Sequence, residues 1–173
     1  MAELMDSAKI NAALDRLANE ISDRHPDIHK LMLIGIQRRG ADLAARMASR
    51  LSQTGQPPLL GSLDINLYRD DWTRLAQGSP NVSGSHMPAA PDGRIIVLVD
   101  DVLFSGRTIR AAMEAILDYG RPDRIELLVL VDRGHRELPI CADYTGCKFE
   151  TRKDQHVDVL LEERDGRDAV LVC

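Results

Sequence analysis

Aromatic residues, paired cysteines and positive net charge are scarce in this sequence. Phe, Trp and Tyr make up 3% of the 173 residues, too few for a platform that stacks many unpaired bases. The three cysteines, Cys141, Cys147 and Cys173, contain no CxxC pair, so we expect free thiols in a reducing compartment. The formal net charge is −5, so binding to RNA would need a local basic patch.

Long hydrophobic runs and targeting signals are missing as well. The longest apolar runs, LMLIGI at 31–36 and IIVLV at 95–99, are far too short to span a bilayer. No apolar stretch preceded by positive charge marks an N-terminal signal peptide. We therefore expect a cytoplasmic protein without a membrane partner. Its length predicts a single domain, residues 1–173, that buries a core without disulfides.

What the sequence does contain is an alternation of helices and buried strands. Apolar residues recur at helical spacing over 10–21, 43–51 and 109–117, and short apolar runs occupy 31–36, 95–99 and 125–131. Such strands, separated by helices, predict an α/β fold with a mostly parallel sheet covered on both faces. We also predict a half-exposed strand over 62–68 and an appended edge from weaker strands at 157–161 and 169–172.

One long segment lacks any periodicity. From Arg69 to about Gly93 the chain is rich in Gly, Ser, Pro and Asn. A loop of that length inside a compact domain usually forms a lid or is disordered. We predict a flexible loop over about 69–93.

Polar and charged residues follow each of the three apolar runs. Asp100 and Asp101 follow the run at 95–99, residues 37–40 (QRRG) follow the run at 31–36, and residues 132–134 (DRG) follow the run at 125–131. Ligands of open α/β sheets bind at the carboxyl ends of the strands. We therefore expect these three groups to meet in one site.

The stretch VDDVLFSGRT, residues 99–108, has the chemistry of a ribose-5-phosphate cradle. Free backbone N–H groups and the helix dipole form an anion site where a loop becomes a helix. Asp100 and Asp101 lie within reach and could accept hydrogen bonds from a ribose 2′,3′-diol. The residues predicted to bind the phosphate and ribose around this turn are Val102, Leu103, Phe104, Ser105, Gly106, Arg107 and Thr108.

Simpler interpretations exist for each of these groups. The acidic pair could be solvated and followed by an N-capped helix. A Walker B strand is a second alternative, although no GxxxxGK[ST] precedes it. Arg38 and Arg39 could lie in a solvated turn, and Asp132 and Arg133 could form a local ion pair.

Beyond these patterns, VDDVLFSGRT resembles the phosphoribosyl-pyrophosphate (PRPP) motif of type I phosphoribosyltransferases. LIGIQRRGADLA resembles that family's pyrophosphate loop, and LDINLYRDD resembles the strand that enters its catalytic loop. The run LVDRGHRELPICADYTG is similar to one branch, the PyrR family of pyrimidine-operon regulators and uracil phosphoribosyltransferases. The resemblance implies a type I phosphoribosyltransferase fold, whose mostly parallel central sheet is flanked by helices. It also implies a flexible catalytic loop and a small hood built from the N- and C-terminal segments.

The resemblance implies that uracil and PRPP are converted to UMP and pyrophosphate with Mg²⁺. Asp100 and Asp101 would hold the ribose hydroxyls and the metal, partly through water. The remaining implied roles are pyrophosphate binding by Arg38, Arg39 and Gly40, closure by catalytic Arg69 and its loop, and shaping of the base pocket by Asp132, Arg133 and His135. Family members also form homodimers or higher homo-oligomers.

Regulatory members of that family bind the leader mRNA of the pyrimidine operon, with UMP or UTP as corepressor. The cations that could contact RNA here are Arg136, Lys148, Arg152 and Lys153, which could equally be scattered over a solvated loop. Asp15, Asn19 and residues 147–150 (CKFE) depart from the family's RNA-binding positions, and Asp15 and Glu150 would repel a phosphate backbone. Three readings stay open: a uracil transferase, an RNA-binding attenuator that senses nucleotides at the transferase site, and a transferase for another base.

Overall fold

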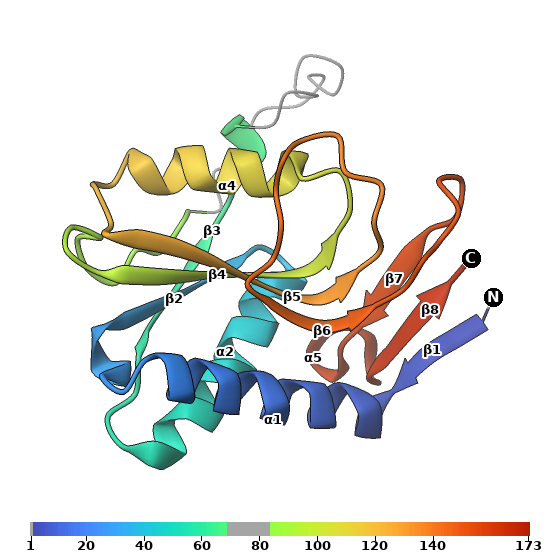
Figure 1. Cartoon of the computed structure of the whole chain (residues 1–173), viewed down its shortest axis with the longest axis horizontal. Helices are drawn as coiled ribbons and strands as arrows, with labels where there is room; N and C mark the ends of the chain where they lie inside the picture. The colour runs from blue at the N-terminus through green and yellow to red at the C-terminus, as the bar shows by residue number, and fades with distance from the viewer. Residues whose placement is uncertain (1, 69–83) are drawn as a thin grey trace.

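Five parallel strands form the central sheet of the computed structural model, which describes residues 2–68 and 84–173 (Figure 1). The strand order is β3-β2-β4-β5-β6. The strands are β2 (Leu31–Ile36), β3 (Leu59–Leu63), β4 (Ile95–Leu103), β5 (Arg124–Asp132) and β6 (Tyr144–Lys148). All four pairings are parallel, so the predicted α/β fold with a parallel sheet is confirmed.

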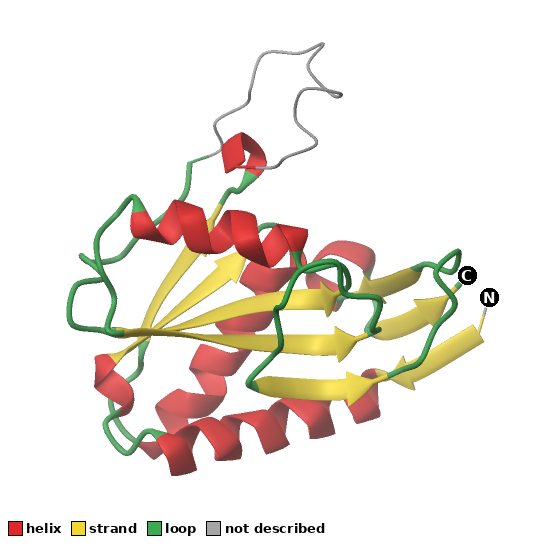
Figure 2. Ribbon diagram, turned by 45° about the horizontal axis from the view of Figure 1, so that its top comes forward, coloured by secondary structure: helices red, strands yellow, loops and turns green. Residues whose placement is uncertain are grey.

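Helices cover both faces of this sheet (Figure 2). One face packs against α1 (Ser7–Arg24) and α2 (Arg39–Leu51), and the other packs against α4 (Arg107–Leu117). Neighbouring strand residues alternate between the two cores: Leu33 packs toward α1 and α2, whereas Ile34 packs toward α4. Burial of each such side chain contributes roughly 1.5–3 kcal/mol, which explains why these strands read as continuous apolar runs.

The first helix illustrates how the sequence specifies an element. Asp6 is its N-cap, because the Asp6 side chain accepts a hydrogen bond from the Lys9 amide at 2.9 Å. The apolar stripe that predicted the helix is fully buried; its residues are Ile10, Leu14, Leu17 and Ile21. Within the described residues, no helix is both long and apolar enough to cross a membrane.

A second, three-stranded antiparallel sheet lies beyond the carboxyl ends of the central strands (Figure 1). It consists of β1 (Ala2–Asp6), β8 (Ala169–Val172) and β7 (Val157–Leu160), and the short helix α5 (Glu162–Asp165) precedes β8. We call this sheet and α5 the hood. The predicted strands at 157–161 and 169–172 therefore exist, and they pair with the N-terminal strand in this second sheet. They add no edge to the central sheet, so the expectation of an appended edge there is wrong. Val159 and Val170 bury against the α1–α2 core, and β6 occupies the edge of the central sheet instead.

The predicted strand over 62–68 is also wrong in its bounds. The strand β3 ends at Leu63, and a 3-10 helix, η3, spans Asn66–Tyr68. The Asp64 side chain accepts a hydrogen bond from the Asn66 amide at 3.0 Å, which turns the backbone out of the strand. Ile65 remains buried whereas Leu67 is 60% exposed, so the apparent alternation combined a strand end with a turn. Two further 3-10 turns, η1 (Ile28–Lys30) and η2 (Ser52–Thr54), complete the described elements.

Candidate active site at the carboxyl edge of the sheet

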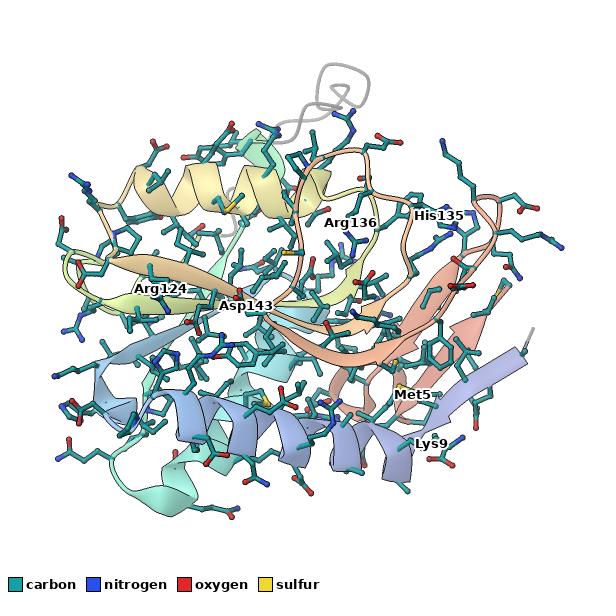
Figure 3. The ribbon with its side chains drawn as sticks, viewed as in Figure 1. Met5, Lys9, Arg124, His135, Arg136 and Asp143 are labelled. Atoms are coloured by element: carbon teal, nitrogen blue, oxygen red, sulfur yellow. The ribbon has the colours of Figure 1, made fainter. Side chains whose placement is uncertain are left out.

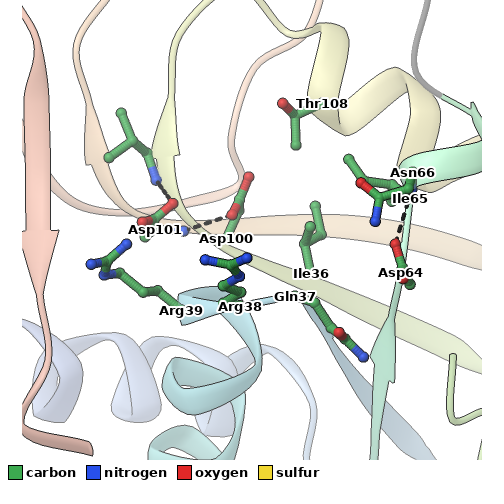
Figure 4. Close-up of a pocket in the computed structure, with 11 residues that line it drawn as sticks. Ile36, Gln37, Arg38, Arg39, Asp64, Ile65, Asn66, Asp100, Asp101 and Thr108 are labelled. Carbon is green, nitrogen blue, oxygen red and sulfur yellow. Dashed lines mark hydrogen bonds between the residues drawn. The ribbon is translucent and has the colours of Figure 1, made fainter. Parts of the chain in front are cut away.

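A pocket of about 450 Å³ opens where β2, β3 and β4 end (Figure 4). It contains residues from two of the three groups that were expected to converge, together with residues from the end of β3. Its lining residues are Ile36, Gln37, Arg38, Arg39, Asp64, Ile65, Asn66, Asp100, Asp101, Val102 and Thr108. The geometry thus brings the basic turn after β2 to the acidic pair of β4.

The acidic pair lies within β4, which continues to Leu103 past the apolar run. Asp100 is only 6% exposed, and its Oδ1 accepts a hydrogen bond from the Asp101 amide at 2.9 Å. Burial, together with the charge of Asp101, raises the pKa of Asp100 well above its ordinary value. Burial also raises the pKa of Asp101, although hydrogen bonds to Asp100 and Val102 and the charge of Arg39 oppose the shift. A cation or hydroxyl donors bound here would stabilise the ionised forms of both.

The donor set suits a magnesium ion that the substrate helps to hold. Mg²⁺ prefers oxygen ligands and is usually bound by one or two carboxylates, water and substrate phosphates. Asp100 and Asp101 supply such carboxylates at the pocket. Across residues 2–68 and 84–173 there is no cluster of three or more His, Cys, Asp or Glu side chains that could hold a metal unaided. The residues present therefore fit a metal bound together with a phosphorylated ligand.

Gly40 allows the start of α2 to approach the acidic pair. A Cβ atom at Gly40 would lie 2.5 Å from the Val99 carbonyl oxygen and 3.4 Å from Oδ1 of Asp100. Only a residue without a side chain fits at this distance. The preceding peptide bond, between Gln37 and Arg38, is cis.

We expect Gly40→Ala to lower the free energy of unfolding by about 1–3 kcal/mol, because the backbone of α2 must move away from β4. Urea denaturation measures this change. Gly84→Ala is the matched control, since nothing lies within 4 Å of its added methyl group. Equal stabilities of the two variants would contradict the tight packing at Gly40.

The two arginines of the basic turn differ in their partners. The Arg39 guanidinium forms an ion pair with Asp165 of the hood at 3.0 Å, and each side chain is about a third exposed or less. Arg38 is exposed and forms no ion pair with any described residue. Figure 4 shows both guanidinium groups beside Asp100 and Asp101. The alternative of a solvated turn therefore fits Arg38 better than Arg39.

The predicted cradle connects β4 to α4. Gly106 caps α4 with a φ of +91°, a left-handed conformation that favours glycine. Val102 and Thr108 line the pocket, whereas Leu103 is buried in the α4 core and Arg107 pairs with Glu137 at 2.8 Å. The remaining cradle residues, Phe104, Ser105 and Gly106, form the turn itself and do not line the pocket.

The residues predicted to shape a base pocket lie at the end of β5 and in the loop after it, outside the pocket lining. Arg133 is buried, lies 4.2 Å from the centre of the Phe104 ring, and donates to Oγ1 of Thr151 at 3.1 Å. His135 contacts the Thr151 carbonyl oxygen through Nε2. The alternative that Asp132 pairs with Arg133 is wrong, because Asp132 pairs with Arg136.

The four cations predicted to contact RNA fall into two groups. Lys148, Arg152 and Lys153 are exposed, and Arg152 pairs with Asp154 at 3.1 Å. Arg136 is only 23% exposed along its side chain, and its guanidinium is held inside the loop after β5. Arg136 therefore does not belong to the exposed basic group.

Arg69, a predicted catalytic residue, and residues 70–83 of the predicted flexible loop lie outside the described residues. Sequence reasoning missed Asp64 and Asn66, which line the pocket, and it gave no separate role to Gln37, which lines the pocket with the basic turn. The available signal was the polar pair Asp64 and Asn66 directly after an apolar strand, the same pattern that identified the acidic pair of β4.

Comparisons with known proteins agree with this geometry. The family described as phosphoribosyl transferase domain matches residues 1–164. The Bifunctional protein PyrR of Syntrophobacter fumaroxidans is 49% identical over 170 residues, which cover 98% of this chain and 91% of the relative. The protein of the same name from Pelotomaculum thermopropionicum is 48% identical over 172 residues, 99% of this chain and 94% of the relative. The chain belongs to the PyrR family of phosphoribosyltransferases.

The predicted family and type I phosphoribosyltransferase fold are thereby confirmed, and the chain is an enzyme of the phosphoribosyltransferase class. Among solved structures, the hypoxanthine phosphoribosyltransferase of Trypanosoma cruzi is similar, with a TM-score of 0.72, 15% identity and coverage of 99% of this chain and 95% of that one. A Staphylococcus aureus hypoxanthine phosphoribosyltransferase has a TM-score of 0.72 at 16% identity, covering 98% and 90% of the two chains. At these identities the likeness shows the fold of this PyrR family member and does not indicate its base.

Proposed function

We propose that the pocket transfers the phosphoribosyl group of PRPP to uracil, forming UMP and pyrophosphate. The observation that carries this proposal is the meeting of three groups at one cavity: the acidic pair of β4, the basic turn after β2, and the start of α4 at Thr108. The relatives named Bifunctional protein PyrR support uracil as the base.

Each group has a distinct task in this reaction. Asp100 and Asp101 accept hydrogen bonds from the ribose hydroxyls, and the amides at the start of α4 bind the 5′-phosphate. Arg38 and Arg39 bind the leaving pyrophosphate, for which guanidinium groups suit bidentate contact. Magnesium, when bound, neutralises part of the pyrophosphate charge. Stabilising the leaving group is then the main source of catalysis.

The experiment that tests the proposal is a turnover assay with PRPP, Mg²⁺ and labelled uracil, with hypoxanthine and guanine in parallel. We expect UMP to form only with uracil and only with both PRPP and magnesium present. Turnover of hypoxanthine or guanine in place of uracil would mean that the substrate of the enzyme is a purine base. Absence of turnover with every base over a broad pH range would overturn the proposed reaction.

Binding to leader mRNA is a second proposed function, and one contact favours it. Arg16 of α1 donates hydrogen bonds to the carbonyl oxygens of Thr145 and Gly146 at 3.0 and 2.7 Å. This contact joins α1 to the segment that carries the three exposed cations, Lys148, Arg152 and Lys153, so both can face one ligand. Asp15, which would repel RNA, accepts a hydrogen bond from Arg50 at 2.7 Å, and this ion pair reduces its repulsion.

A gel-shift with the leader of the organism's pyrimidine operon tests this second function. We expect binding that strengthens with UMP or UTP and weakens steeply as salt rises. Absence of binding at low salt would overturn the RNA-binding function and leave only the transferase function.

We also propose that the protein forms a homo-oligomer, and light scattering measures its oligomeric state. A cytoplasmic location is supported by the three cysteines, which are free.

A further inference from the structure

Arg136 lies where the loop after β5 crosses the loop after β4 (Figure 3). Its guanidinium donates to two carbonyl oxygens of the cradle, those of Phe104 at 2.8 Å and Leu103 at 3.4 Å. It also donates to two carbonyl oxygens of its own loop, those of Ile140 at 2.9 Å and Gly134 at 3.2 Å. The carboxylate of Asp132 completes the set. One partly buried side chain therefore ties the two loops together.

The backbone that follows Arg136 is also hydrogen-bonded to the cradle. The Ser105 carbonyl oxygen accepts hydrogen bonds from the amides of Glu137 at 2.9 Å and Leu138 at 3.2 Å. Gly106 lies against the same loop, since a Cβ atom there would be 3.3 Å from Ile140. The cradle therefore packs against residues 136–140. Arg136 contacts it where β4 ends and the turn begins.

The acceptors explain why arginine is needed at this position. The Leu103 carbonyl oxygen already accepts a hydrogen bond from the Arg133 amide at 3.1 Å, so Arg136 matters most for Phe104 and Ile140. For these two carbonyl oxygens Arg136 is the only donor among the described residues, and a buried carbonyl without a donor is costly. A guanidinium has five donors in a rigid plane, whereas an ammonium is a compact group with three. Lysine could retain the charge and the pairing with Asp132, but not all of the carbonyl contacts.

We propose that Arg136 is a positioning residue for PRPP binding: it fixes the Leu103–Thr108 turn in the shape that receives the 5′-phosphate. The proposal rests on the function proposed above and reassigns a residue that the sequence analysis placed with the RNA-binding cations. Arg136 does not line the pocket, so it acts through the backbone of the turn and not through the substrate.

Kinetics of Arg136→Lys and Arg136→Met test the proposal. We expect both variants to raise the KM for PRPP roughly 10- to 100-fold, the range for lost hydrogen bonds of a charged group, with kcat and the KM for uracil changed far less. Arg121→Lys and Arg121→Met are matched controls, because Arg121 is exposed in the loop after α4, and they should match the parent protein. A role in charge alone predicts instead that lysine restores the KM for PRPP, which would overturn the proposal.

Two further measurements keep the test sharp. Calorimetric titration with ribose 5-phosphate should show the same loss of affinity without any turnover. A fall in leader-RNA binding with an unchanged KM for PRPP would return Arg136 to the RNA face and overturn the proposal. Should both variants unfold, Asp132→Ala keeps Arg136 but removes the carboxylate that orients its guanidinium, and an unchanged KM for PRPP there would overturn the proposal equally. A parent protein that binds neither PRPP nor ribose 5-phosphate would refute the proposed function itself.

Discussion

Asp101→Asn should lose about 100-fold or more of the turnover with PRPP and uracil, the usual cost of removing one preorganised electrostatic partner of a transition state. Asp101 lines the pocket beside Arg39, and its Oδ1 accepts a hydrogen bond from the Val102 amide at 2.8 Å. Asparagine preserves this hydrogen bond and the shape of the side chain. What it removes is the negative charge that would face the ribose hydroxyls and the metal. Initial rates at saturating substrates measure the loss.

The stability of the same variant separates a lost charge from a lost fold. Burial raises the pKa of both Asp100 and Asp101, so ionising the pair in the folded protein is unfavourable. We therefore expect Asp101→Asn to be at least as stable as the parent at neutral pH, measured by urea denaturation. Asp23→Asn, on the exposed face of α1, is the control and should change neither turnover nor stability. Unchanged turnover in Asp101→Asn would remove Asp101 from the proposed mechanism.

The position of the acidic pair could be predicted because its physics is local. A fully apolar strand followed by Asp100 and Asp101 indicates the carboxyl edge of a parallel sheet, and Arg38 and Arg39 follow the same logic one strand away. The turn before α4 could be predicted in the same way, because Gly106 and Thr108 lie where a loop must become a helix.

The residue pattern alone could not predict the strand pairing within the hood or the contacts of Arg136, because both depend on partners far apart in the chain. Ala2 of β1 pairs with Val172 of β8, and strands of four or five residues carry too little periodicity to reveal such a pairing. From its charge alone, Arg136 is a cation that could contact RNA or lie on a solvated loop. Its acceptors are mostly backbone carbonyls of two loops, which carry no signal in the residue types.

Glu126→Ala should lower the free energy of unfolding by about 3–5 kcal/mol, the range for removing one partner of a buried ion pair. Glu126 is 1% exposed at the start of β5. Its carboxylate accepts hydrogen bonds from the Tyr144 hydroxyl at 2.6 Å and from Nε2 of His25 at 2.8 Å. Arg124 adds an ion pair at 3.3 Å, and Arg24 approaches within 3.8 Å. Removing the carboxylate leaves two buried polar groups without their acceptor, which is more costly than the lost contacts alone.

Two comparisons isolate this effect in urea denaturation. Tyr144→Phe removes one donor and should cost about 1–3 kcal/mol. Glu114→Ala breaks an ion pair with Arg110 whose glutamate side chain is 53% exposed, so it should cost at most about 1 kcal/mol. If Glu126→Ala were no less stable than Glu114→Ala, the buried network would contribute nothing to the fold.

The pH dependence of stability gives an independent check on Glu126. Burial raises the pKa of this carboxyl, but hydrogen bonds from Tyr144, His25 and Arg124 and the charge of His25 lower it by more, so the net pKa lies below its ordinary value of 4.5. A carboxyl with a lowered folded pKa contributes stability that is present above the unfolded pKa and is lost as pH falls through the folded pKa. The parent should therefore be more stable than Glu126→Gln at pH 7, and this difference should shrink as pH falls below about 4.5. A difference that stays constant down to pH 3 would mean that the charge of Glu126 does not stabilise the folded state, and that only the shape of the side chain does.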